Sequence, residues 1–93
     1  MYSRQTTVRN RSWLHARPAA DFVKEAVKFR SSIKIAKKEQ PEESVNAKSL
    51  VLVLSLSVAP NGQVQISAEG EDEQAAVDAL IAAVDSGLGE GEQ

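Results

Sequence analysis

The 93-residue sequence contains no cysteine, which excludes disulfide bonds, thiolate catalysis and cysteine metal sites. With only one histidine it offers few ligands to a metal ion, and we expect neither a metal nor another cofactor. It has no run of about 18 apolar residues that could cross a membrane, and its first residues lack the apolar segment of a signal peptide. The net charge of −2 shows no basic excess, which argues against a nucleic-acid partner. We therefore expect a cytoplasmic protein without membrane insertion.

What is present fits one small globular domain, because 93 residues leave no room for a second core. The apolar share of 42% and the charged share of 26% are those of an ordinary soluble protein. We assign residues 1–88 to the domain and expect residues 89–93, which are only glycine, glutamate and glutamine, to form a flexible tail.

Short segments with alternating or β-branched side chains predict four strands. A polar turn from Lys38 to Glu43, which contains Pro41, separates the second strand from a short third one. The expected strands are Gln5 to Arg9, Ser32 to Lys37, Ser44 to Asn46 and Gln63 to Ala68. The side chains expected to point inward from them are those of Ile33, Ile35, Val64, Ile66 and Ala68.

Two segments have the apolar spacing of amphipathic helices. The first runs from Ala16 to about Phe29, and its expected apolar face is Ala19, Phe22, Val23, Ala26 and Val27. The second runs from about Glu71 to Ser86, with Val77, Leu80, Ile81 and Val84 on one face. Both segments therefore predict amphipathic helices with one buried side.

Leu50 to Leu54 is a run of five apolar residues that periodicity cannot assign. Its valines favour a strand, whereas Ser49 is a typical N-cap residue of a helix. The residues alone leave both alternatives open.

The segment from Leu14 to Ala20 carries the only histidine, His15, two residues before Arg17. Pro18 fits the first turn of a helix, where its missing N–H costs nothing. A neutral imidazole is a nucleophile near pH 7, and the unpaired N–H groups of a helix N-terminus attract anions. The segment therefore predicts a site where a phosphoryl group is bound to His15.

Three separate motifs resemble the histidine-containing phosphocarrier protein HPr of the bacterial sugar phosphotransferase system. They occur in the order and spacing of that family and extend over nearly the whole chain. The matching residues are Leu14–Ala19 with Phe22–Val23, then Asn46–Leu50, and then Ile66–Glu73. The resemblance implies an α+β fold of the open-faced sandwich type, in which three helices cover one face of a four-stranded antiparallel sheet in the order βαββαβα. It also implies that the run after Ser49 is a short helix.

The resemblance implies that His15 accepts a phosphoryl group from phosphorylated enzyme I, which takes it from phosphoenolpyruvate, and passes it to an enzyme IIA domain. The backbone N–H groups of Ala16 and Arg17, with the Arg17 guanidinium, would hold the phosphoryl oxygens. Ser49 matches the serine that an HPr kinase/phosphorylase modifies in many relatives. The protein would then be a substrate of enzymes more than an enzyme, and we expect a monomer.

Partner docking is expected on apolar residues near His15 and on one basic residue. These are Ala16, Ala20, Lys24, Leu50, Val51 and Leu54. Five consecutive apolar residues cannot all be buried by one helix face, so some of Leu50 to Leu54 should be exposed.

The sequence departs from the family pattern at Trp13, where most members have glycine, and at Val51 to Val53, where glycine and methionines are common. The turn from Lys37 to Glu43 is also longer than usual. Two alternatives stay open: a carrier of the nitrogen-related phosphotransferase branch, and a regulatory docking module that is switched by phosphorylation of Ser49.

Overall fold

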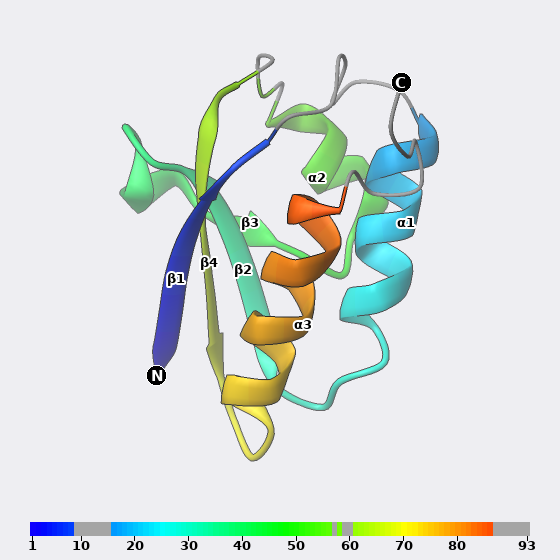
Figure 1. The fold of residues 1–93 in the computed structure, drawn as a ribbon, viewed down its shortest axis with the longest axis vertical. Coiled ribbons are helices and arrows are strands. Elements are labelled where there is room, and N and C mark those ends of the chain that lie inside the picture. The colour runs from blue at the N-terminus through cyan, green and yellow to red at the C-terminus, as the bar shows by residue number, and fades with distance from the viewer. Residues whose placement is uncertain (9–15, 57, 59–60, 87–93) are drawn as a thin grey trace.

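The computed structural model describes residues 1–8, 16–56, 58 and 61–86, and it has the predicted layers (Figure 1). Four antiparallel strands form a sheet in the order β1-β4-β2-β3. Three α-helices, α1, α2 and α3, lie on one face of this sheet and leave the other face open. The predicted fold class is therefore confirmed. The predicted tail, residues 89–93, lies outside the described residues.

The elements follow one another along the chain in the expected order, with one additional 3₁₀ helix, η1. Their bounds are β1 Tyr2–Thr7, α1 Ala16–Ala26, β2 Ser32–Lys37, η1 Pro41–Glu43, β3 Val45–Asn46, α2 Leu50–Ser55, β4 Gln63–Glu69 and α3 Glu73–Asp85. β2 has the predicted ends, and β3 and β4 differ from prediction by one residue at one end. The undecided run after Ser49 is helical.

The first strand begins three residues earlier than the predicted Gln5 to Arg9. Its side chains that share a face with the buried residues of β4 are Tyr2, Arg4 and Thr6. These polar groups meet carboxylates of α3: Tyr2 and Arg4 donate to Asp78 at 2.9 and 3.0 Å. Because this inward face is polar, hydrophobic alternation could not reveal where the strand begins.

α1 ends at Ala26 and not near Phe29, so the predicted end was wrong. The N–H groups of Lys28 and Phe29 donate to carbonyls three residues back, at 3.2 Å each. Such bonds tighten the last turn as the chain leaves the helix. Val27, predicted on the apolar face, is 54% exposed because the chain turns away from the core here.

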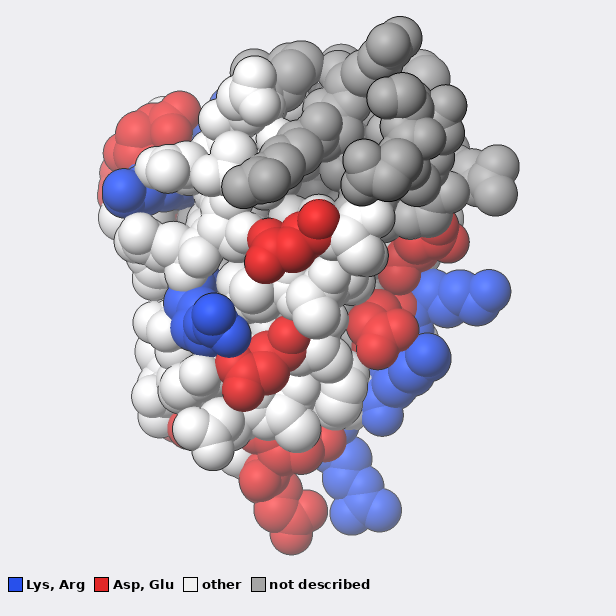
Figure 2. All heavy atoms as spheres, viewed as in Figure 1, with Lys and Arg blue, Asp and Glu red and all other residues white. Residues whose placement is uncertain are grey.

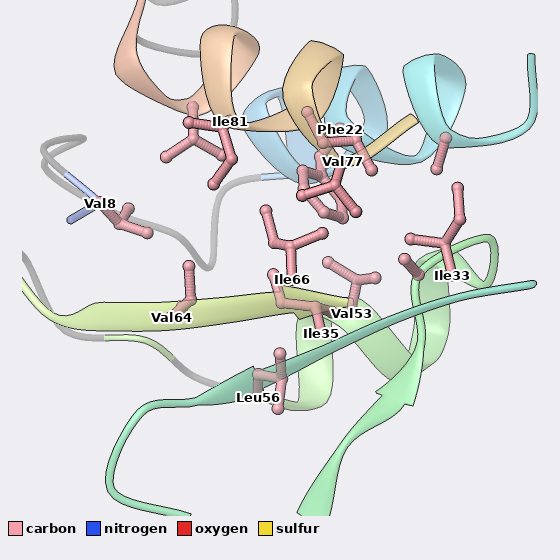
Figure 3. Close-up of a cluster of buried hydrophobic side chains, with 14 of the residues drawn as sticks. Val8, Phe22, Ile33, Ile35, Val53, Leu56, Val64, Ile66, Val77 and Ile81 are labelled. Carbon is pink, nitrogen blue, oxygen red and sulfur yellow. The ribbon is translucent and has the colours of Figure 1, made fainter. Parts of the chain in front are cut away.

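The core lies between the sheet and the helices (Figure 3). Phe22 of α1 and Val77 of α3 face Ile66 of β4 and Ile35 of β2, and all four are fully buried. Val53 is the buried residue of α2. The inward positions predicted on β2 and β4 are confirmed, since Ile33, Ile35, Val64, Ile66 and Ala68 are all buried.

α3 begins at Glu73, two residues after the predicted start, because Asp72 has another role. Its carboxylate accepts hydrogen bonds from the backbone N–H groups of Arg30 and Ser31, both at 2.9 Å, and from the Ser31 hydroxyl. These bonds join the turn before β2 to the turn before α3. Ser31 is 2% exposed, so this contact is a polar clamp at the edge of the core.

We expect Asp72→Asn to weaken the fold more near neutral pH than in acid. The hydrogen bonds from Ser31 and from the Arg30 N–H lower the pKa of Asp72 from 3.8 to about 2. A carboxylate whose pKa is depressed by folding stabilises the protein above its unfolded value, and this contribution is lost as the pH falls towards 2. Urea unfolding of both proteins at about pH 6 and about pH 2.5 measures the effect.

The difference in the free energy of unfolding between wild type and Asp72→Asn should be smaller at the lower pH than at the higher one. Both will lose stability in acid, because the Gly70 N–H lowers the pKa of Glu73 and the Arg4 guanidinium lowers that of Asp78. Only the difference between wild type and variant therefore reports on Asp72. An unchanged difference at both pH values would contradict the prediction.

Candidate functional site

α1 begins at Ala16, the residue that follows His15 in the sequence. The first N–H groups of an α-helix have no partner within the helix and form its positive end. The first turn of α1 contains no acidic residue that would compensate this end. Pro18, which lacks an N–H, is fully buried in this turn, as its role in starting the helix requires.

His15 and Trp13 lie outside the described residues, and the side chains of Ala16 and Arg17 are not described. The helix start that was predicted from Pro18 is confirmed. The phosphoryl contacts of His15 and Arg17 stay predictions.

The buried Ala19, Phe22 and Ala26 hold α1 against the core and turn its opposite face outward. Ala20 is half-buried and Lys24 is exposed on this outer part, one helical turn apart. Figure 2 shows both basic and acidic side chains along the edge where α1 lies. Lys28 there pairs with Glu25 at 3.0 Å.

α2 exposes three consecutive aliphatic side chains, which we call the α2 apolar patch: Leu50, Val51 and Leu52, with exposed fractions of 36%, 76% and 41%. Leu54, predicted in the docking surface, packs partly buried against the core. Leu52, which was not predicted, is exposed instead. Leu52 and Leu54 flank the buried Val53 on its two sides, and it is the Leu54 side of α2 that packs against the core.

Ser49 is the N-cap of α2, and its hydroxyl accepts a hydrogen bond from the Leu52 N–H at 3.4 Å. The predicted capping is thus confirmed. Beside it, the Lys48 ammonium donates to the Phe29 carbonyl at 2.7 Å, in the turn that follows α1. No pattern in the sequence indicates this contact, since it joins residues 19 positions apart.

The sequence profile described as "PTS HPr component phosphorylation site" matches residues 2–86 of this chain. The chain belongs to the HPr family. This is a family of phosphocarrier proteins, and interaction with the enzymes of the phosphotransferase system is a property of the family. None of the helices in the described part of the chain has the length and apolar character needed to cross a membrane.

Known members of the HPr family differ in length and in name. The chain is 48% identical over 84 residues to a multiphosphoryl transfer protein of Vibrio cholerae, covering 90% of this chain and 21% of that protein. It is 41% identical over 85 residues to the HPr-like protein Crh of Halalkalibacterium halodurans, covering 91% and 98%. The chain thus spans about a fifth of the length of the multiphosphoryl transfer proteins it matches.

Solved HPr structures have the same fold. A crystal structure of HPr-C-His from Thermoanaerobacter tengcongensis superposes with a TM-score of 0.88 at 41% identity, covering 99% of this chain and all of that one. A second structure, described as an HPr dimer from the same organism, gives a TM-score of 0.72 at 47% identity and covers 83% and 85%. A crystal structure of Crh from Bacillus subtilis also matches, with a TM-score of 0.72 at 40% identity, covering 95% of this chain and 98% of that one.

Proposed function

We propose that this protein carries a phosphoryl group on His15, which it accepts from phosphorylated enzyme I and passes to an enzyme IIA domain. The observation that carries the proposal is the start of α1 at Ala16, directly after the only histidine of a chain that matches the HPr profile. The positive end of a helix next to this imidazole favours the charge that the phosphoryl group brings.

The transfer needs a nucleophile and a set of hydrogen-bond donors. Nδ1 of the neutral imidazole attacks the phosphorus atom, and the bond to the histidine of enzyme I breaks as the new bond forms. The N–H groups of Ala16 and Arg17 and the Arg17 guanidinium then hold the phosphoryl oxygens. In the second transfer, a histidine of enzyme IIA attacks the phosphorus atom, and the imidazole of His15 is the leaving group.

The test is incubation of the purified protein with phosphoenolpyruvate and a bacterial enzyme I, followed by intact-mass measurement. We expect one added phosphate that is lost in acid and stable in base, as a phosphohistidine is. No adduct on the folded protein with several enzymes I would contradict the proposal.

We propose that partners dock on the α2 apolar patch together with Ala16, Ala20 and Lys24 of α1. The patch carries no charge, since none of the six residues of α2 is charged. Its exposed aliphatic groups would be buried against an apolar surface of the partner, which is favourable by about 25 cal/mol per Å² of apolar area. Lys24 at the rim would steer acidic partners.

We expect Val51→Asp to raise the KM for this protein in the enzyme I reaction about tenfold, with kcat nearly unchanged. The change places a charge where an apolar side chain docks, but it leaves the chemistry at His15 intact. Val27→Asp is the matched control, because Val27 is also an exposed valine but lies at the far end of α1. Equal effects of both variants would show that docking does not depend on the α2 apolar patch.

A regulatory role through Ser49 is the second candidate function, supported by the Crh relative and by the place of Ser49 at the start of α2. A phosphate there would add about 1.5 to 2 negative charges next to the α2 apolar patch and weaken docking of acidic partners. An ATP-dependent HPr kinase/phosphorylase should then attach an acid-stable phosphate, unlike the one on His15.

We further propose a cytoplasmic monomer. The α2 apolar patch has three side chains, whereas a stable protein interface buries about 1,200 to 2,000 Å². The small patch favours transient docking over a permanent dimer, although structures of HPr from T. tengcongensis and of Crh from Bacillus subtilis are described as dimers.

A further inference from the structure

α2 is a short helix whose only anchors in the core are Val53, Leu54 and its C-cap residue Leu56 among the described residues. It has six residues, of which Val53 is buried and Leu50, Val51 and Leu52 are exposed. Isolated helices shorter than about 12 residues are marginal in water. The position of the α2 apolar patch therefore depends on contacts made by the residues around it.

The turn before α2 sets the direction in which the helix leaves β3. The Asn46 side-chain oxygen accepts a hydrogen bond from the Lys48 N–H at 2.9 Å, and the Asn46 carbonyl accepts one from the Ser49 N–H at 3.2 Å. Such a turn is typical of asparagine. These bonds lie within the turn, so they do not connect α2 to α1.

Beside the apolar packing between the two helices, Lys48 adds a polar connection through its side chain. Its ammonium donates to the carbonyl oxygen of Phe29 at 2.7 Å, in a partly buried contact. Phe29 lies just beyond the C-terminal end of α1 and packs against the core, so it is a firm anchor. Because the donor is an ammonium group, this is a charge-assisted hydrogen bond, which is stronger than one between neutral groups.

We propose that Lys48 is a positioning residue for partner docking, which fixes the α2 apolar patch relative to α1. The proposal rests on the proposed function, because it assumes that α1 and α2 together form the docking surface. Because the ammonium donates to the Phe29 carbonyl, the charge of Lys48 holds α2 in place and does not bind the partner. Loss of the bond lets α2 move relative to α1 and misplaces the patch relative to the start of α1.

Lys48→Met tests this, because methionine keeps an apolar stem of similar shape but cannot donate a hydrogen bond. We expect amide hydrogen exchange to become faster in α2 while α3 and β4 keep their wild-type rates. In the enzyme I reaction, KM should rise about three- to tenfold with kcat unchanged. Lys48→Arg, which keeps the donor, should restore most of the wild-type KM and exchange rate.

Lys34→Met is the matched control, since Lys34 is exposed on the open face of the sheet. It should leave α2 exchange and KM unchanged. The proposal is wrong if Lys48→Met leaves α2 exchange as in wild type, if exchange rises equally in α2, α3 and β4, or if Lys34→Met raises KM as much. If wild type accepts no phosphate at all, the proposed function fails, while the exchange rates of α2 still decide whether Lys48 positions this helix.

Discussion

His15→Ala should gain no acid-labile phosphate from phosphoenolpyruvate and enzyme I, which is a complete loss of the carrier reaction. The sequence has one histidine, so no second imidazole can take over the group. A serine hydroxyl has a far higher pKa than an imidazolium, and it is not nucleophilic near pH 7 without a base. Intact-mass measurement after a fixed incubation time gives the result directly.

Ser49→Ala is the reciprocal control for this prediction. It removes the other proposed phosphorylation site and should still gain the acid-labile phosphate on His15. Circular dichroism of both variants checks that they are folded. An acid-labile adduct that persists in His15→Ala would place the phosphoryl group elsewhere and overturn the assignment.

The start of α1 could be predicted from the sequence because its signals are local. Pro18 marks the first turn, and Ala19, Phe22 and Ala26 repeat at helical spacing. All four are buried in the structure. The position of His15 just before the helix follows from the same signals, and the family motif then adds the chemistry.

The beginning of β1 could not be predicted, because its inward side chains carry polar groups that pair with carboxylates of α3. Arg4 faces the same side as Ile66 but pairs with Asp78, 74 residues away. Only the folded chain brings such partners together. The position of Lys48 is hidden for the same reason, since its bond to the Phe29 carbonyl leaves no pattern in the sequence.

The assignment of Leu50 to Leu54 needed information beyond periodicity. In a helix capped by Ser49, Leu52 and Leu54 lie on opposite sides of the buried Val53, at equal angles from it. Helical spacing therefore cannot tell which of the two is exposed, because the packing of α2 against the rest of the fold decides this. The docking prediction consequently included Leu54, which packs against the core, and omitted Leu52.

Gly70→Ala should destabilise the fold by about 2 to 5 kcal/mol, from backbone strain and overpacking together. Gly70 has a φ of 152°, a conformation that residues with a side chain rarely adopt. A Cβ at this position would lie 2.6 Å from the Ser31 hydroxyl oxygen and 2.8 Å from the Ser31 Cα. Urea unfolding at neutral pH measures the loss.

Ser31 cannot move aside to make room for this Cβ. It is 2% exposed, and both its N–H and its hydroxyl donate to the Asp72 carboxylate. A shift of Ser31 would break these bonds and leave a buried polar group without a partner. Gly70→Ala and Asp72→Asn therefore both act on the position of Ser31. Their losses in the free energy of unfolding should not simply add when the two changes are combined.

Glu71→Ala is the matched control, because it introduces alanine at the next residue of the same turn. Glu71 is 82% exposed and pairs with the exposed Arg30 at 3.7 Å, so we expect a change within about 0.5 kcal/mol. The Gly70 turn and the start of α1 lie at opposite ends of the molecule (Figure 1). Gly70→Ala that is still folded should therefore accept a phosphoryl group at the wild-type rate. If Gly70→Ala is as stable as wild type, the turn relaxes around the added Cβ and the stability prediction is wrong. If the folded variant accepts the phosphoryl group more slowly than wild type, the change at Gly70 alters the start of α1, and the expected independence of the two regions is wrong.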